Sequence, residues 1–271
     1  MGELVDPALL NGRGASTQWM NLGWWDETNT AGLTYATAAA ELARQVGLAA
    51  RLRAGDRVLD VGCGAGDSTA LWIRAFGAAH VKGIEPNPTV AARSADRIAR
   101  WGLGDRITIS AQTADAFDDA AVLARASAIV SVDAAYHFDT RTQWLQRMGA
   151  MSAPGVRLGL FDIALRDAQD RPRFVSHAHR AGIPTDNLWS VDEVAPTLEA
   201  AGFTDVRVRP CSAEVFAGFI RFVQRNAPRL AMHPSQGGWR ALATALMLAG
   251  AGERLTAVLI GAERNAAGAR A

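Results

Sequence analysis

The chain has 271 residues, of which 49% are hydrophobic and 20% are charged, and its formal net charge is +1. This balance is typical of a globular protein with a sizeable core and excludes a disordered chain. A net charge so close to zero provides no long-range field that would attract nucleic acid or an anionic membrane, so we expect neither as a partner.

The two cysteines, Cys63 and Cys211, provide neither a disulfide framework nor a metal-binding quartet. We therefore expect no metal and a reducing, cytoplasmic location. The N-terminal residues lack the basic and then apolar pattern of a signal peptide. The longest apolar stretch, 241–251, has about half the ~20 residues that a membrane-spanning helix needs.

The first 50 residues predict a helical N-terminal segment. Trp19, Trp24 and Trp25 lie close together, and apolar residues recur at helical spacing from Ala31 to Ala50. Strands and helices then alternate, which predicts a parallel sheet with helices on both faces. The expected strands are 58–61, 81–84, 107–110, 128–132 and 156–163, and the expected helices are 68–76, 89–100, 118–125 and 141–151, the last with a cap at Thr140.

The alternation stops after residue 163. Residues 164–189 are polar and contain two prolines, which predicts an irregular segment. Ser190 and Glu193 form a capping-box pattern for a helix that Gly202 ends. The rest of the chain predicts a strand over 203–208, two helices within 212–250 separated by Pro228 and Pro234, and a last strand over 254–261.

Three glycines, Gly62, Gly64 and Gly66, follow the first strand of the alternating region and precede a helix. Glycine lets the backbone turn tightly and lets a ligand approach the peptide groups. The spacing G-x-G-x-G differs from the G-x-G-x-x-G of dinucleotide-binding folds, and no Gly-Lys-Ser/Thr follows, which excludes a nucleoside-triphosphate loop.

Acidic residues on both sides of this loop, Asp60 and Asp67, would repel a pyrophosphate and suit a ligand with positive charge. S-adenosylmethionine (SAM) carries an ammonium, a sulfonium and a carboxylate, which match acidic side chains and the free N–H groups of a helix N-terminus. Glu85 ends the next strand, where an acid accepts hydrogen bonds from ribose hydroxyls. Asp115 follows the third strand, where the adenine amino group is expected.

Three segments resemble the first three motifs of the class I SAM-dependent methyltransferases: 58–66 (VLDVGCGAG), 83–87 (GIEPN) and Thr113-Ala114-Asp115-Ala116. The resemblance implies a Rossmann-like, doubly wound α/β sheet of seven strands with the last strand antiparallel. It also implies SAM as cofactor and S-adenosylhomocysteine as product, with Pro86 and the 113–116 segment at the cofactor. Within the class, Asn21-Leu22-Gly23-Trp24-Trp25 is similar to the Asn-Leu-Gly-Tyr-Trp signature of bacterial natural-product and sugar methyltransferases, with Trp24 replacing the usual Tyr.

The fourth strand leads into Asp133 and Tyr136-His137-Phe138, at the carboxyl ends of the strands where ligands bind in this fold class. An unperturbed histidine titrates near ~6.5, so His137 is our candidate general base; a packed structural histidine is the alternative. Asp162 ends the fifth strand, and in related sugar methyltransferases a His and an Asp at these two places form the active pair. We expect Asp133 at the methionine part of SAM.

Aromatic and histidine side chains are the candidates for acceptor binding. Tyr136 and Phe138 flank His137 and are expected to line an apolar acceptor site. The same role is predicted for the N-terminal tryptophans, which would form a lid, and for two histidines of the irregular segment; packing and solvation are the alternatives. These further candidates are Trp24, Trp25, His177 and His179.

We therefore predict one domain: a lid and helix (1–50), a SAM-binding core (51–163), an acceptor-side cap with a helical insert (164–250), and a last strand with a tail (251–271). The predicted activity is methyl transfer from SAM to a hydroxyl, amine or activated carbon of a small secondary metabolite. A non-methylating SAM-binding protein or cyclase and an NAD-dependent oxidoreductase are the alternatives. A homodimer is one assembly that the sequence leaves open.

Overall fold

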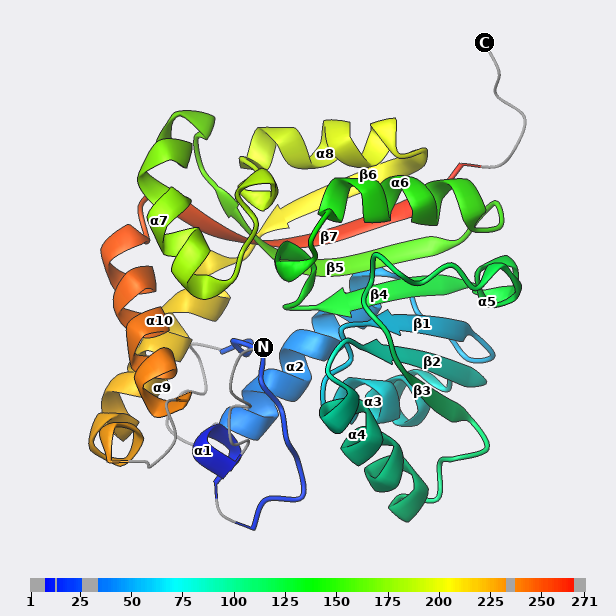
Figure 1. The fold of residues 1–271 in the computed structure, drawn as a ribbon, viewed down its shortest axis with the longest axis horizontal. Helices are drawn as coiled ribbons and strands as arrows, with labels where there is room; N and C mark the ends of the chain where they lie inside the picture. Colours follow the sequence, from blue (N-terminus) through cyan, green and yellow to red (C-terminus); the bar gives the residue numbers. More distant parts are fainter. Residues whose placement is uncertain (1–7, 13, 26–33, 233–236, 266–271) are drawn as a thin grey trace.

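A single seven-stranded sheet organises the chain in the computed structural model, which describes residues 8–12, 14–25, 34–232 and 237–265 (Figure 1). The strand order is β3-β2-β1-β4-β5-β7-β6, and β7 runs antiparallel to both of its neighbours. The expected sheet with an antiparallel last strand is confirmed. The strands are β1 (Arg57–Val61), β2 (His80–Glu85), β3 (Ile107–Ala111), β4 (Ala128–Val132), β5 (Arg157–Leu165), β6 (Phe203–Pro210) and β7 (Leu255–Arg264).

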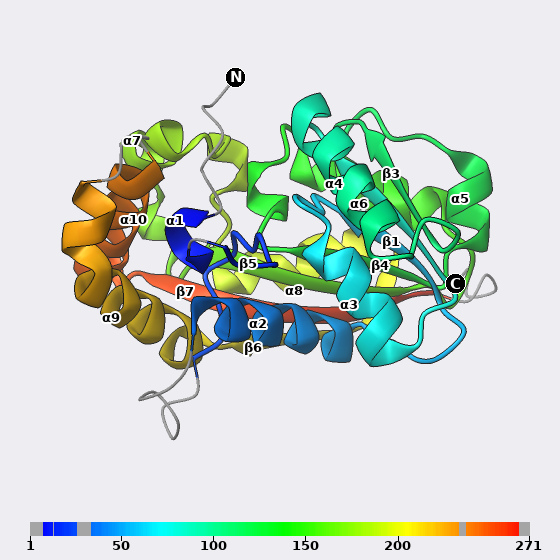
Figure 2. The ribbon, with the colours of Figure 1, turned by 90° about the horizontal axis from the view of Figure 1, so that it is seen from below.

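Helices cover the sheet and extend one of its ends. Figure 2 shows α2 and α3 side by side along one face, with α9 and α10 together at the end of the molecule. Within the described ranges, no helix combines the length and the apolar character that crossing a membrane requires. The helices are α1 (Ala8–Asn11), α2 (Tyr35–Ala49), α3 (Asp67–Phe76), α4 (Pro88–Arg100), α5 (Ala120–Arg125), α6 (Arg141–Met151), α7 (Arg171–Ala181), α8 (Val191–Ala200), α9 (Ser212–Ala231) and α10 (Gly237–Ala251), with short 3-10 turns η2 (Ala135–His137), η3 (Ala168–Asp170) and η4 (Thr185–Asn187).

The central strands are buried on both faces because their side chains alternate between two apolar clusters. Val58 and Val130 point into the cluster that contains the buried residues of α2. Leu59 and Ile129, the next residues along the same strands, point into the cluster formed with α6 and α8. This double burial explains why the strands read as short continuous apolar runs in the sequence.

The segment expected to be irregular, 164–189, contains the helix α7, so that expectation is wrong. Pro172 occupies the first turn of α7, where its missing N–H is not needed. Gly182 ends the helix with a φ of +68° in the left-handed region, where glycine is favoured. Because α7 buries only Phe174 and Ala178, it has too little apolar periodicity to be recognised.

The other expectations on helix ends have different outcomes. The capping box of Ser190 and Glu193 is present at the start of α8 and is confirmed. Pro228 was expected to separate two helices, and that expectation is wrong. It lies in the last turn of α9, where it removes only one backbone hydrogen bond. Pro234, the other expected separator, lies outside the described residues. Thr140 occupies the N-cap position of α6 without capping it.

Candidate active site

The glycine loop between β1 and α3 is tightly packed at two of its glycines. Gly62 and Gly66 have φ values of +79° and +87°. A Cβ on Gly62 would lie 2.6 Å from the Cβ of Ala134, and one on Gly66 would overlap the Ser94 hydroxyl. Any larger residue would be strained at these positions and would also displace a neighbour. The contact with Ala134 places the loop directly against the segment that leads into η2.

Asp60, the last but one residue of β1, is buried beneath this loop and is 1% exposed. Its Oδ2 accepts hydrogen bonds from the Ser68 hydroxyl and the Trp72 indole, both at 2.7 Å. Its Oδ1 is buried and has no partner among the described residues. Burial raises the pKa of Asp60 to about 6, although the two hydrogen bonds oppose the shift. A buried carboxylate oxygen without a partner fits the ammonium group of a ligand.

Two further acids that were predicted at the cofactor, Glu85 and Asp115, follow the glycine loop along the chain and lie at the same edge of the sheet as Asp60. In the parallel register Val61 pairs with Ile84, and Glu85 pairs with Ala111 at the end of β3. The Glu85 carboxylate accepts hydrogen bonds from the amides of Gly64 (3.1 Å) and Asn87 (3.0 Å), and burial raises its pKa. These bonds fix its two oxygens at the mouth of the glycine loop. Pro86, beside it, is exposed.

The turn after β3 contains the other residues expected near the adenine. The Thr113 hydroxyl accepts a hydrogen bond from the Ala116 amide at 3.1 Å, and Ala114 is buried. One oxygen of Asp115 accepts a hydrogen bond from Thr140 at 2.6 Å. The turn is therefore held by its own hydrogen bonds and by the residue that precedes α6.

Asp67, expected to face a positive ligand, instead has a protein cation as its partner. Its two oxygens accept hydrogen bonds from Arg97 at 2.7 and 3.0 Å, and both side chains are 6% exposed. The amide of Gln18 also donates to Asp67 at 3.1 Å. These contacts join α3, α4 and the N-terminal segment. They do not favour a role at the cofactor for Asp67, which stays a prediction.

Asp133 follows β4 in a left-handed conformation with a φ of +57°. Its carboxylate accepts hydrogen bonds from the Tyr136 hydroxyl (2.7 Å) and the Leu22 amide (2.8 Å). Burial raises its pKa to about 6, although both hydrogen bonds oppose the shift. Asp133 thus connects the N-terminal segment to η2.

His137 has a side chain suited to accept a proton. It is exposed, and its Nδ1 lies 3.2 Å from the carbonyl oxygen of Gly182. Since a carbonyl oxygen only accepts, we assign the ring proton to Nδ1 and a free lone pair to Nε2. Although the residue is exposed at the surface, desolvation by the surrounding protein lowers the pKa of His137, which favours the neutral ring.

Asp162 does not form the expected pair with His137, because its carboxylate has other partners. Arg141 makes a buried ion pair with Oδ2, and the Ile163 amide donates to Oδ1 at 2.8 Å. The side chains of Arg141 and Asp162 are 1% and 3% exposed. Asp162 therefore affects His137 through its negative charge, which raises the pKa of the ring, and not through a hydrogen bond.

Comparison with known proteins decides the family. Residues 34–208 match the family model described as a methyltransferase domain, which is more than half of the chain. The chain belongs to this family. It is a SAM-dependent methyltransferase, with S-adenosylhomocysteine as the second product, as expected from the sequence.

The methyltransferase is similar to the erythromycin 3''-O-methyltransferase of Saccharopolyspora erythraea, with 29% identity over 77% of this chain and 69% of that protein. It is also similar to the methyltransferase GfsG of Streptomyces halstedii, with 28% identity over 81% and 80%. Among solved structures, the [4+2]-cyclase SpnF is similar with a TM-score of 0.74, 20% identity and coverage of 96% and 92%. At that identity the likeness shows the shared fold.

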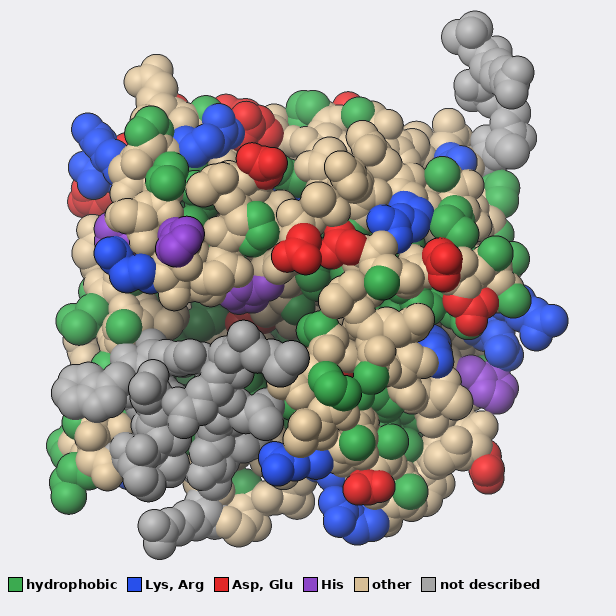
Figure 3. Space-filling view, in the orientation of Figure 1, with side chains coloured by type: hydrophobic (Ala, Val, Ile, Leu, Met, Phe, Trp, Pro, Cys, Tyr) green, Lys and Arg blue, Asp and Glu red, His purple; other side chains and the backbone are tan. Residues whose placement is uncertain are grey.

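The methyltransferase has an apolar pocket beside η2. It lies between the end of β5, α7, η4 and α10 and has a volume of about 50 Å³. Its lining consists of nine aliphatic or methionine side chains together with Tyr136, Phe174, His177, Asn187 and Trp189. Figure 3 shows a hollow on this face, with histidine side chains beside and within it. Two of the expected acceptor residues, Tyr136 and His177, line the pocket, and His179 does not. Both histidines are exposed.

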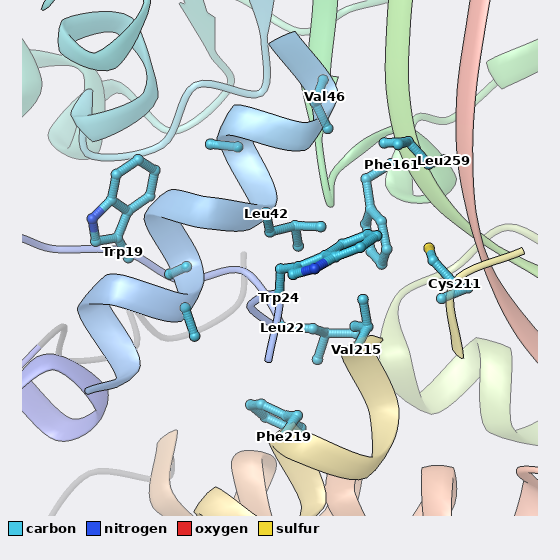
Figure 4. Packing of buried hydrophobic residues seen from close by; sticks show 14 of the residues in the cluster. Trp19, Leu22, Trp24, Leu42, Val46, Phe161, Cys211, Val215, Phe219 and Leu259 are labelled. Atoms are coloured by element: carbon cyan, nitrogen blue, oxygen red, sulfur yellow. The ribbon is translucent and has the colours of Figure 1, made fainter. Parts of the chain in front are cut away.

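Other expected acceptor residues have packing partners. The Phe138 ring packs edge-on against Trp144, at 5.0 Å between centroids. Trp24 is 8% exposed and lies between α2 and β5 (Figure 4), and Trp25 is 5% exposed and stacks on Phe222 at 5.5 Å. These three rings therefore contribute to packing, and a role in acceptor binding stays a prediction for them.

A larger cavity, of about 310 Å³, lies between α1, α2 and α9 and includes Trp25 and Tyr35 in its lining. None of its lining residues belongs to the glycine loop or to η2. The smaller pocket, by contrast, contains Tyr136, the neighbour of His137.

The sequence reasoning missed Arg141, Gly182 and Asn187. Gly182 and Asn187 contact His137 and Tyr136, and Arg141 contacts Asn187 and Asp162. The partners in these hydrogen bonds lie 21 to 51 positions apart in the chain. No motif links such distant positions, and only one of the basic residues is not Arg, so an individual arginine does not stand out.

Proposed function

We propose that this methyltransferase transfers a methyl group from SAM to a hydroxyl oxygen of a small natural product, with His137 as general base. The observation that carries the proposal is the hydrogen bond from His137 Nδ1 to the Gly182 carbonyl, which leaves Nε2 free to accept a proton. A hydroxyl needs such a base more than an amine does, because an alcohol is a weak acid at neutral pH.

The cofactor supplies an electrophilic methyl group on a cationic sulfur. The residues of this chain would hold it at the end of the sheet: Asp60 Oδ1 is free to meet its ammonium, and Glu85 stands where ribose hydroxyls would donate. His137 Nε2 would accept the acceptor's proton as its oxygen attacks. The names of several relatives, including the 27-O-demethylrifamycin SV methyltransferase of Amycolatopsis mediterranei at 28% identity, support oxygen as the methylated atom.

The pocket next to His137 indicates what part of an acceptor it would take. Its walls are mostly apolar, with Ile163, Leu188 and Met247 among them, and its volume suits a small apolar group and not a whole molecule. We therefore propose an acceptor that inserts a small alkyl branch next to the hydroxyl that is methylated.

The proposal is tested with His137→Ala, assayed for S-adenosylhomocysteine release with a panel of hydroxylated natural products. We expect turnover to fall about 10²- to 10⁴-fold, since a positioned base contributes a factor of this size. SAM affinity, measured by calorimetry, should not change, because no described contact joins His137 to the glycine loop.

The matched control is His80→Ala, which removes an exposed histidine at the opposite, amino-terminal end of β2. This variant should keep full turnover. Equal turnover of His137→Ala and the unmodified protein would remove His137 from the base role. Methylation of an amine with no effect of His137→Ala would replace the hydroxyl with a nitrogen acceptor.

A further inference from the structure

Asn187, in η4, is the most completely buried amide side chain near the proposed base, at 2% exposure. Its Nδ2 donates to the carbonyl oxygens of Tyr136 (3.0 Å) and Phe138 (2.6 Å). These are the two residues on either side of His137. One side chain thus fixes the backbone both before and after the base.

The same loop fixes the ring of His137 as well as its backbone. Gly182, which accepts from His137 Nδ1, ends α7 five residues before Asn187. The Asn187 amide N–H donates to the Pro184 carbonyl at 2.9 Å, which holds the turn between these two contacts. The loop 182–187 therefore determines both the position of the base and the nitrogen that carries its proton.

Arg141 anchors Asn187 in its place. Its Nη2 donates to the backbone carbonyl of Asn187 at 2.6 Å, and its Nη1 forms the buried ion pair with Asp162. The guanidinium also stacks over Trp189, 3.5 Å from the ring centroid. Breaking such a buried pair is expensive, so the position of the Asn187 backbone is strongly determined.

We propose that Asn187 is a positioning residue that holds His137 in the orientation for proton transfer, with Arg141 holding Asn187. This inference rests on the proposed role of His137 as base. Asn187 has no contact with the glycine loop. It is one of the residues that line the apolar pocket, but its side-chain N–H groups are taken by the two carbonyl oxygens, so we assign its effect to the η2 backbone. Loss of its two hydrogen bonds frees η2 to move, and a displacement of about 1 Å at a reacting group is enough to lower the rate about 10²-fold.

Asn187→Ala should therefore lower kcat about 10- to 100-fold, with no change in SAM affinity. The independent readout is the ¹⁵N spectrum of the histidine rings, which distinguishes a proton on Nδ1 from one on Nε2. The His137 signals, assigned with His137→Ala, should change from a defined Nδ1–H form to a mixture of both tautomers. The matched control is Asn226→Ala in α9, which removes a similar amide-to-carbonyl bond, to Phe222 at 2.8 Å, away from His137.

Asn187→Asp keeps the shape of the side chain and provides a second test if Asn187→Ala does not fold. An ionised carboxylate would repel the two carbonyl oxygens, whereas the protonated form can donate to one of them. Burial raises the pKa of such a group. The variant still needs the neutral ring of His137, so its kcat should rise with pH as His137 loses its proton and then fall as the introduced carboxyl ionises, whereas the kcat of the unmodified protein should stay high.

If either folded Asn187 variant has the same kcat and the same His137 ring spectrum as the unmodified protein, the positioning role is overturned. The proposed function fails on a different result, namely full turnover by His137→Ala. Because the ring spectrum needs no turnover, the two failures can be distinguished.

Discussion

At the scale of single residues, the strongest indication of a ligand is the unpaired Oδ1 of Asp60. The ligand-free carboxyl has a pKa of about 6 because it is buried, whereas an ammonium next to Oδ1 would favour its ionised form. Below pH 6 a proton must therefore leave Asp60 before the ammonium can be held. We predict that the Kd for SAM rises by up to about tenfold as pH falls from 6 to 5, measured by titration calorimetry.

Asp60→Asn tests the same contact without a change of pH. The amide keeps an acceptor for Ser68 and Trp72 but has no charge for the ammonium, so SAM affinity should fall about 10- to 100-fold at pH 7.5, as for a lost charge-assisted hydrogen bond. The variant's Kd should also vary less between pH 6 and 5. A variant that binds SAM as tightly as the unmodified protein would mean that the ammonium is held elsewhere.

The acids predicted to bind the cofactor stand out in the sequence because they adjoin the glycine loop or follow a predicted strand. The partners of these residues could not be found in this way. That Asp67 pairs with Arg97 and Asp162 with Arg141 depends on how α4 and α6 lie on the sheet. Both pairs close only after the chain has folded, so the local pattern contains no trace of them.

At the scale of elements, the alternating region was predicted to within a few residues, since its strands are buried runs and its helices have caps or glycine ends. The cap beyond β5 was predicted less well. Helix α7 has one buried aromatic residue, and α9 continues through Pro228, so neither follows the usual signals. Their positions are determined by tertiary packing: α7 lies against η3 and η4, and α9 lies against α10, β7 and the Trp25 ring.

Gly218 in α9 shows how close this packing is, since a Cβ there would overlap the Cβ and Cγ of Trp25. We predict that Gly218→Ala lowers the free energy of unfolding by about 1–3 kcal/mol, because α9 or the indole must move. Urea unfolding measures this. Gly250→Ala in α10, where a Cβ would meet nothing within 4 Å, is the matched control and should be neutral or stabilising. Equal effects of both substitutions would contradict the close contact.

At the scale of the whole molecule, the N-terminal segment is tied across the carboxyl edge of the sheet although it precedes the residues matched by the family model. The Leu22 amide donates to Asp133, the Trp24 amide to Ala38, and the Trp25 amide to Glu214. Residues 19–25, all buried except Met20, are therefore part of the folded core. Their contacts join the β4 end, α2 and α9 into one unit.

Arg97, which pairs with Asp67, links this segment to the glycine loop. Its guanidinium donates to the carbonyl of Ser16 in the segment and to the carbonyl of Ala65 in the loop. Arg97→Met leaves Asp67 buried without a cation, which should lower the free energy of unfolding by about 3–5 kcal/mol. The double variant with Asp67→Asn should recover part of this loss, because the buried charge is gone. Urea unfolding of both single variants and the double variant measures the coupling.

An exposed pair provides the comparison. Arg44 and Glu41 are 45% and 31% exposed, so Arg44→Met should change stability by only about 0–1 kcal/mol. If Arg97→Met lowers the free energy of unfolding by as little as Arg44→Met does, the pair is not what joins the segment to the loop. The same conclusion follows if the loss in the double variant equals the sum of the losses in the two single variants. A large coupling would instead make SAM affinity depend on Arg97, since release of the segment also frees the Ala65 carbonyl inside the loop.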